Sequence, residues 1–164
     1  MNKQQAKIIA LLNERGVMVE EIAEIVMRLQ KPYIKDISQA DCIDSVMSVL
    51  DKREVQYALY TGISLDQLAE QKLLPSPLQE IVETDEPLYG VDEILAFGIT
   101  NVYGSIGLTS FGYLDKEKIG IIKTLDNHQD KIHTFLDDLV AGIAAAASAR
   151  IAHRTSGTSL DDAE

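Results

Sequence analysis

The 164-residue sequence has no tryptophan, only 5% aromatic residues and a single cysteine, Cys42. With so few aromatic rings, a hydrophobic core must be built from Leu, Ile, Val and Ala, which favours packed helices over a sandwich of sheets. One cysteine cannot form an intrachain disulfide, and this fits a reducing compartment such as the cytoplasm. Cys42 lies in a periodic apolar stretch without a neighbouring His or Arg, so we expect a buried structural residue.

Positive charge is also scarce, because 15 Lys and Arg residues stand against 26 Asp and Glu residues and give a formal net charge of −11. An acidic surface repels phosphate backbones, so nucleic acid is excluded as an expected partner. Anionic membrane surfaces are repelled as well, unless metal ions or a local basic patch intervene. The same acidic excess can supply carboxylate ligands for metal ions.

The first residues do not have the pattern expected of a signal peptide, since they are amphipathic and charged at both ends. The longest uncharged run lies between Glu93 and Asp115 and is long enough to span a bilayer. Glycine and polar residues interrupt it at Gly98, Asn101, Gly104, Ser105, Gly107, Ser110 and Gly112. We therefore expect a buried helix followed by a glycine-rich loop over residues 104–112, with a membrane-dipping segment as the alternative.

The spacing of apolar residues predicts an all-α, compact multi-helix bundle of about six to eight helices, with no strand pattern. Helices are expected over 4–14, 17–30, 38–60, 65–71, 91–103, 115–125 and 134–153, and another opens at Ser76–Pro77. They form one domain over residues 1–154, followed by a disordered tail over 155–164. The last helix is rich in alanine, and we place it at the centre of the bundle, where its small residues let neighbouring backbones come close.

Several common catalytic motifs are missing. Cys42 is not followed by an arginine at the spacing of a phosphocysteine loop, and no glycine-rich loop ends in Gly-Lys-Ser or Gly-Lys-Thr. The three histidines, His128, His133 and His153, form no His-x-x-x-His pair, which disfavours zinc. What remains is carboxylate chemistry, and its hard oxygen ligands suit magnesium.

Three acidic segments stand out in the second half of the chain. They are Gly90-Val91-Asp92-Glu93, the stretch FGYLDKEKIGIIKTLD over 111–126, and LDDLVAGIAAA over 136–146. In that order and spacing they resemble the phosphatidylglycerophosphatase A family. The matching positions are Asp92 and Glu93 for its Asp-Glu pair, Phe111, Asp115, Lys118 and Asp126 for its central block, and Asp137, Asp138, Ala141 and Gly142 for its Asp-Asp motif.

The resemblance implies a magnesium-dependent enzyme that hydrolyses the phosphomonoester of phosphatidylglycerol phosphate to give phosphatidylglycerol, in phospholipid biosynthesis. We expect Asp92, Glu93, Asp137 and Asp138 to be the metal ligands. Asp137, Asp138 and Lys118 are the expected catalytic residues, and Lys118, Asp115 and Asp126 are expected to bind substrate. The expected partners are a phospholipid phosphate, the inner face of the membrane through a peripheral contact, and further copies of the chain in a homo-oligomer.

The sequence also departs from the family pattern. Gly112 stands where the family usually has arginine, and Ile119 and Ile121 stand where it usually has prolines. The membrane-spanning segments of the family are replaced by weaker, glycine-broken ones. The chain therefore looks like a soluble branch of the family, in which the substrate could have changed to another phosphate ester.

Each acidic segment also has a purely structural interpretation. Thr134 and Asp137 have the spacing of a helix capping box, and Asp115 and Lys118 that of a surface ion pair on a helix. Asp92 and Glu93 suit the first turn of a helix because its N-terminus carries partial positive charge. The neighbouring acids Asp85 and Glu86 are expected in a solvated turn.

Two other functions fit parts of the sequence. Glu21 and Glu24, followed by Asp41 and Asp44, imitate the acidic pairs with which all-α nucleotide pyrophosphohydrolases bind magnesium. A non-catalytic helical interaction module, whose acids are merely solvated, is the third hypothesis.

Overall fold

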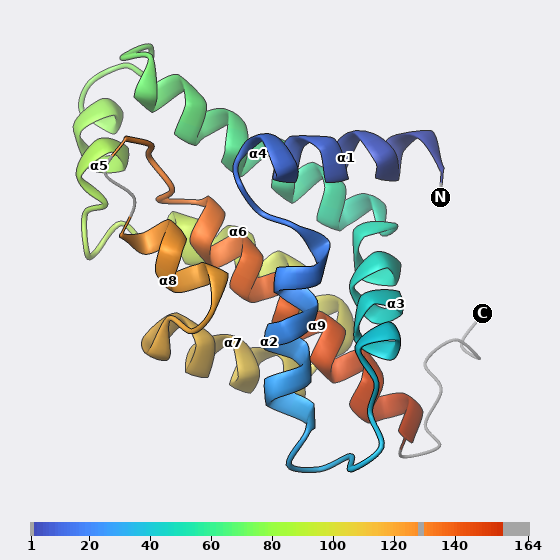
Figure 1. The fold of residues 1–164 in the computed structure, drawn as a ribbon. Helices are drawn as coiled ribbons and strands as arrows, with labels where there is room; N and C mark the ends of the chain where they lie inside the picture. Colours follow the sequence, from blue (N-terminus) through green and yellow to red (C-terminus); the bar gives the residue numbers. More distant parts are fainter. Residues whose placement is uncertain (1, 128–129, 156–164) are drawn as a thin grey trace.

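The chain folds around its last helix, α9 (Leu136–Thr155), which crosses the middle of the molecule (Figure 1). The computed structural model describes residues 2–127 and 130–155, and these contain nine α-helices, one 3₁₀-helix and no strand. The all-α fold is thereby confirmed. The helices before α9 are α1 (Lys3–Glu14), α2 (Val19–Gln30), α3 (Gln39–Leu50), α4 (Arg53–Glu70), α5 (Leu78–Thr84), α6 (Val91–Thr100), η1 (Asn101–Tyr103), α7 (Ser105–Glu117) and α8 (Ile121–Asp126).

Helix α9 is enclosed on all sides. Every residue from Leu136 to Ala149 is buried, and the helix packs against α2, α3, α4, α6, α7 and α8. A helix that is apolar around its whole circumference belongs in a core. At Gly142 the backbone of α6 comes so close that an added Cβ would lie 3.1 Å from the backbone oxygen of Ala96. The predicted central position of this helix is therefore confirmed.

The N-terminal helices follow their local sequence signals. Helices α1 and α2 lie close to their predicted ranges. Helix α3 begins with the predicted capping box, in which the Asp41 N–H donates to Ser38 Oγ at 3.1 Å and the Ser38 N–H donates to Asp41 Oδ2 at 3.0 Å. Cys42 in its first turn is fully buried, as expected. Exposed backbone groups at these helix starts thus find partners within a few residues.

The glycine-rich loop predicted over residues 104–112 is wrong, because this segment is helix α7. Glycine disfavours a helix by about 1 kcal/mol per residue, but burial of Phe111 and Leu114 against the core outweighs that cost. Gly107 is itself useful, since a Cβ there would lie 3.0 Å from the backbone oxygen of Thr100. Asp115 consequently lies in the last turn of α7 and does not begin a helix.

Two further helix boundaries differ from the prediction. The helix expected over 38–60 is broken at Asp51 and Lys52, and Gly62 lies inside α4 without ending it. Thr134 does not cap α9, because its hydroxyl donates to the backbone oxygen of Val82 at 2.6 Å and the helix begins at Leu136. At Thr134 a contact with a distant residue, which sequence spacing does not reveal, prevents the predicted cap.

No helix within residues 2–127 and 130–155 has the length and apolarity needed to cross a membrane. Thr155, the first residue of the predicted tail, still belongs to α9. The rest of that predicted tail, residues 156–164, lies outside the described residues.

Candidate active site

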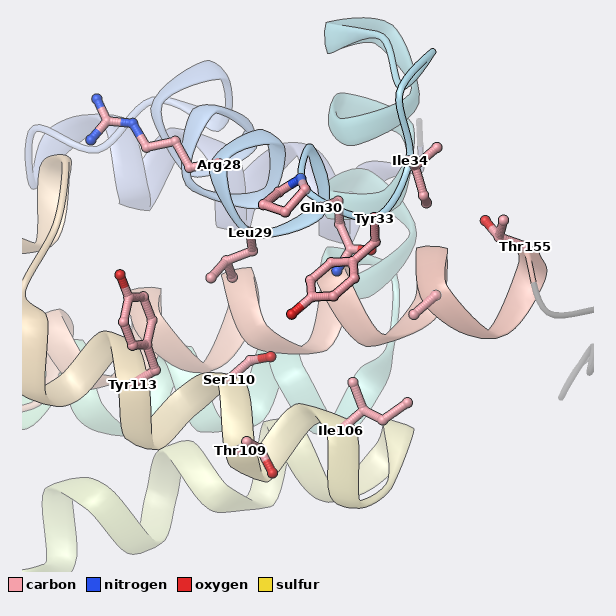
Figure 2. Close-up of a pocket in the computed structure, with 12 residues that line it drawn as sticks. Arg28, Leu29, Gln30, Tyr33, Ile34, Ile106, Thr109, Ser110, Tyr113 and Thr155 are labelled. Atoms are coloured by element: carbon pink, nitrogen blue, oxygen red, sulfur yellow. The ribbon is translucent and has the colours of Figure 1, made fainter.

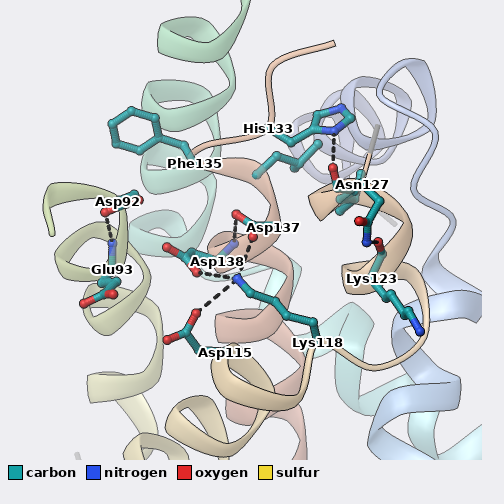
Figure 3. Close-up of polar contacts among 12 residues, drawn as sticks. Asp92, Glu93, Asp115, Lys118, Lys123, Asn127, His133, Phe135, Asp137 and Asp138 are labelled. Atoms are coloured by element: carbon teal, nitrogen blue, oxygen red, sulfur yellow. Dashed lines mark hydrogen bonds and ion pairs between the residues drawn. The ribbon is translucent and has the colours of Figure 1, made fainter. Parts of the chain in front are cut away.

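Five segments converge on one acidic cavity of about 260 Å³. They are the connection between α5 and α6, the start of α6, the ends of α7 and α8, and the start of α9 (Figure 3). All seven residues that the sequence singled out line this cavity: Asp92, Glu93, Asp115, Lys118, Asp126, Asp137 and Asp138. These seven residues, up to 46 positions apart from Asp92 to Asp138, thus meet at one place.

Two helix starts supply the paired acids. Asp92 and Glu93 lie in the first turn of α6, and Asp137 and Asp138 lie in the first turn of α9. The first acid of each pair accepts a hydrogen bond from the backbone of the next residue. Asp92 Oδ1 accepts the Glu93 N–H at 3.0 Å, and Asp137 Oδ1 accepts the Asp138 N–H at 2.8 Å. Free N–H groups and the positive dipole end of each helix favour negative charge in these turns.

The side chain of Lys118 reaches the middle of the carboxyl groups (Figure 3). Its Nζ donates to Asp137 Oδ2 at 2.7 Å and to Asp115 Oδ1 at 3.1 Å, and it lies 3.8 Å from Asp138 Oδ1. Lys118 ends α7 in the left-handed region, with φ of 46°. A residue other than glycine pays about 1–3 kcal/mol for such a backbone conformation, and strain of this kind concentrates at functional sites.

An aromatic pair fixes the end of α7 that carries Asp115 and Lys118. Phe111 is buried and its ring meets that of Phe97 in α6 edge to face, with centroids 5.0 Å apart and planes at 72°. This geometry is favourable for aromatic rings. The phenylalanine of the central sequence motif therefore packs α7 against α6, one turn before Asp115, and contributes geometry to the site.

Negative charge dominates the cavity, which is lined by eight carboxyl groups and one ammonium group. Asp92, Asp137 and Asp138 are all buried. Burial raises the pKa of each of these three acids, and for Asp138 the charge of Asp137 adds to the effect. Burial by itself lowers the pKa of Lys118, but the charge and hydrogen bond of Asp137 outweigh it and raise that pKa.

Asp138 is the least satisfied of these acids. Its Oδ1 is buried and has no hydrogen-bond partner, and its contact with Lys118 is an ion pair at 3.8 Å. A buried carboxylate oxygen without a partner costs free energy. In the described part of the chain, no three Asp, Glu, His or Cys side chains already surround a common ion position, and the Lys118 ammonium lies among the carboxyl groups instead.

A larger hollow of about 860 Å³ lies elsewhere, between α2, α7 and the end of α9. Figure 2 shows Tyr33 and Tyr113 reaching into it from opposite sides. Its lining is mostly apolar and includes no acid, histidine or cysteine. This hollow therefore lacks the carboxyl, imidazole and thiol groups that acid, base or metal chemistry needs.

Comparisons with known proteins identify the family of the chain. A sequence profile described as Phosphatidylglycerophosphatase A matches residues 8–153. The chain belongs to the phosphatidylglycerophosphatase A family. The match extends well beyond the last half of the chain, where the sequence motifs lie, and includes the N-terminal helices.

Its relatives are close in both sequence and structure. The uncharacterized protein YpjQ of Bacillus subtilis (strain 168) is 65% identical over 143 residues, which are 87% of this chain and 81% of that protein. The uncharacterized protein YutG of the same organism is 56% identical over 158 residues, 96% of this chain and 95% of YutG. The crystal structure of the low temperature requirement C protein from Listeria monocytogenes superposes with a TM-score of 0.91 at 51% identity, over 94% of this chain and 98% of that one.

Membership of the family is consistent with a phosphatase, and the geometry adds residues that the sequence did not indicate. Asp85 and Glu86 were expected in a solvated turn; both are exposed, but they also line the cavity. Asp85 ends α5 with φ of 51°, so two of the three described non-glycine residues with positive φ lie at this site. The unusual backbone of Asp85 could not be recognised from its sequence neighbourhood.

The structure also gives structural explanations for three of the four acids of the pyrophosphohydrolase hypothesis. Glu21 accepts the Met18 N–H at 2.8 Å at the start of α2, and Asp41 caps α3. Asp44 pairs with Arg150 and Arg154 of α9, at 3.6 and 3.5 Å. Glu21, Asp41 and Asp44 lie on two different helices, and each has its own structural partner. The acids of the cavity, in contrast, face one another.

Proposed function

We propose that the protein is a magnesium-dependent phosphomonoester hydrolase that converts phosphatidylglycerol phosphate to phosphatidylglycerol. The observation that carries the proposal is the cavity in which eight carboxyl groups surround one lysine, in a member of the phosphatidylglycerophosphatase A family. A cavity with this charge repels a phosphate dianion unless cations are bound with it. Phosphate chemistry at this site therefore calls for divalent metal.

Magnesium fits the residues that line the cavity. Its preferred ligands are carboxylate oxygens and water, and the lining offers carboxylates from two helix starts. The buried Oδ1 of Asp138, which has no hydrogen-bond partner, is the kind of atom that a bound cation satisfies. We assign Asp92, Glu93, Asp137 and Asp138 as the residues that would hold magnesium. Bound there, the ion would neutralise charge on the phosphate and lower the pKa of a coordinated water.

The remaining chemistry belongs to the protein's own side chains. Lys118, already directed among the carboxyl groups, binds a phosphate oxygen as a counter-ion, and Asp115 helps to hold its ammonium group. The free N–H groups at the start of α9 also favour an anion. Asp126, at the end of α8, lines the cavity at an exposed position suited to contact with the rest of the substrate.

Hydrolysis then needs a positioned water and a base. The water oxygen forms a bond to phosphorus, and the bond between phosphorus and the glycerol oxygen breaks. One carboxylate accepts a proton from the attacking water, and a solvent water donates a proton to the departing glycerol oxygen. We assign the base to the Asp137–Asp138 pair, because both carboxyl groups are buried and line the cavity at the start of α9.

The surroundings of the cavity favour a lipid substrate. Along the segment that lines the cavity, exposed apolar side chains alternate with lining residues: Leu88 is 93% exposed, Val91 45% and Ile94 64%. Exposed apolar groups of this size, placed together, are typical of contact surfaces for partners or lipids. We propose that these three residues touch the membrane surface at its inner face while the phosphate enters the cavity.

A phosphate-release screen tests the activity. Phosphatidylglycerol phosphate and soluble phosphomonoesters are each incubated with the protein in magnesium and in EDTA. We expect release from the lipid, only with magnesium. Glu117→Gln, which changes an exposed acid of α7 outside the cavity, serves as the matched control and keeps full activity. Release that is equal in EDTA, or no release from any phosphomonoester, contradicts the proposal.

Vesicle sedimentation tests the membrane contact separately. With vesicles of phosphatidylglycerol and phosphatidylcholine in magnesium, we expect the protein to co-sediment and Ile94→Glu to remain in the supernatant. Tyr57→Glu changes a side chain of similar exposure, 59%, on α4 and serves as the control. Equal binding by both variants would assign the membrane contact to another surface. The homo-oligomer and the cytoplasmic location stay predictions.

A further inference from the structure

The start of α9 is held by another helix. Asp66 in α4 is fully buried, and its two carboxyl oxygens accept the backbone N–H groups of Phe135 and Leu136, each at 3.0 Å. The first N–H groups of a helix need acceptors from outside the helix. Thr134 does not provide one, because its hydroxyl is bonded to Val82. Asp66 therefore takes the place of a local cap.

A second carboxyl group of α4 holds the same connection. Glu70 Oε1 accepts the N–H of Ile132 at 2.9 Å. Arg15 joins them, since its Nη2 donates to the backbone oxygen of Ile132 at 2.7 Å and to Glu70 Oε1 at 2.6 Å. Residues four apart share one helix face, so α4 presents Asp66 and Glu70 together to the segment that leads into α9.

Close packing fixes the distance between the two helices. Gly62, one turn before Asp66, lies so near α9 that an added Cβ would be 2.5 Å from Leu139 Cδ1 and 3.0 Å from Phe135 Cβ. The hydrogen bonds of Asp66 thus act across a contact that leaves little freedom for either helix.

Asp137 and Asp138 follow Leu136 directly in the sequence. The direction of a helical side chain depends on its position in the helix, so the residue at which α9 begins determines where these two acids point. We propose that Asp66 and Glu70 are positioning residues of the active site: by holding the backbone at Ile132, Phe135 and Leu136, they set the directions of Asp137 and Asp138. This inference rests on the proposed function.

Magnesium affinity separates positioning from mere stabilisation. Asp66→Asn keeps the size of the side chain but replaces one acceptor oxygen by an NH₂ group, which cannot accept the N–H bond. Loss of hydrogen bonds that orient metal ligands typically weakens metal binding by about 10- to 100-fold, and we expect a change of that size. Calorimetric titration of magnesium into the folded protein measures the magnesium affinity. Phosphate release gives kcat, which we expect to fall together with that affinity.

Ser45→Ala is the matched control. Ser45 Oγ donates to the backbone oxygen of Ala147 at 2.8 Å, so this variant also removes a buried side-chain bond to α9, but near its other end. We expect both variants to lower the melting temperature, and only Asp66→Asn to weaken magnesium binding. If both variants bind magnesium like the wild type, Asp66 only stabilises the fold and the inference is overturned.

Glu70→Gln covers the case in which Asp66→Asn fails to fold. The side chain of Glu70 is 25% exposed, so this substitution is milder. Weaker magnesium binding by the folded Glu70→Gln protein supports the inference, and unchanged binding overturns it. A wild-type protein that binds no magnesium overturns the proposed function itself, so the two failures can be told apart.

Discussion

The N-terminal helices and the cavity both carry Asp and Glu residues, but these acids lie in opposite surroundings. Asp41 in α3 is exposed, and hydrogen bonds from the Ser38 hydroxyl and N–H lower its pKa. Asp138 in α9 is buried, its Oδ1 has no hydrogen-bond partner, and burial together with the charge of Asp137 raises its pKa. The first arrangement stabilises a helix start, whereas the second destabilises the fold. Acids kept in such a costly environment are typical of functional sites.

Substitutions in the two regions are expected to differ most in their effect on phosphate release. Asp138→Asn removes an ionisable oxygen from the cavity but keeps its shape, and we expect phosphate release to fall by about 10²- to 10⁴-fold, the usual contribution of an acid–base group. Asp41→Asn is expected to keep the wild-type rate. Phosphate release with magnesium measures both, and circular dichroism verifies the helical content. Wild-type turnover by Asp138→Asn would remove this acid from the mechanism.

The increase in melting temperature caused by magnesium is the second property expected to differ between the two regions. If it binds the folded cavity, magnesium at about 100 times its dissociation constant adds about 2.7 kcal/mol to the free energy of unfolding. For a chain of this size that raises the melting temperature by about 5–10 °C. Asp138→Asn is expected to lose most of this increase and Asp41→Asn to retain it. An equal increase with sodium chloride of matched ionic strength would mean that the ions only screen surface charge.

The pH dependence of stability is expected to differ in sign between Asp66, which holds the start of α9, and Asp41 in α3. Burial raises the pKa of Asp66 to about 8, against the opposing N–H bonds of Phe135 and Leu136. The folded state therefore keeps a proton that the unfolded chain releases near pH 4, and its stability decreases as the pH rises toward 8. From about pH 6 to about pH 9 the expected loss from Asp66 is about 2–3 kcal/mol.

Urea denaturation in EDTA measures this dependence, and Asp66→Asn is expected to flatten it. Asp41 acts in the opposite sense: its folded pKa is lowered, so its contribution is present above the unfolded pKa and is lost as the pH falls through the folded value. Asp41→Asn is therefore expected to change stability at neutral pH and not at strongly acidic pH. A wild-type stability that rises from pH 6 to pH 9 would contradict the proposed burial effect.

The smallest effect is expected at Glu24. This exposed residue of α2 belongs to the acidic pairs of the pyrophosphohydrolase hypothesis. We expect Glu24→Gln to leave phosphate release and the magnesium-dependent melting temperature unchanged, because neither depends on α2. A loss of activity in this variant would transfer the active site to the N-terminal region and reverse the comparison.

The sequence allowed good predictions where the signal is local. Ser38 and Asp41 revealed the start of α3, and the alanines of the last helix indicated its central place. Seven of the residues that line the cavity were also singled out, because three motifs in order resemble one family. Motifs of this kind report which residues act together, even though spacing alone cannot show that α6, α7, α8 and α9 meet.

The sequence was misleading where distant contacts decide. Gly107 and Gly112 indicated a loop, but they lie in α7, which is stabilised by the burial of Phe111. Asp66 escaped notice because it lies on the buried face of α4 together with Ile63 and Ala69, where no acid is expected. The available signal was an acid at an apolar position of a helix. The hydrogen bonds from the N–H groups of Phe135 and Leu136 explain why an acid lies there.

The enclosure of α9 has a consequence for how this protein tolerates mutation. Its first turn carries Asp137 and Asp138, and the thirteen residues from Asp137 to Ala149 are all buried. A larger side chain at Gly142 would press on the backbone of Ala96 in α6, and Ala145 is fully buried, so we expect such substitutions to displace α9 together with both acids. We therefore expect inactivating substitutions to be spread along the whole helix, at alanines that never touch a substrate as well as at the acids themselves.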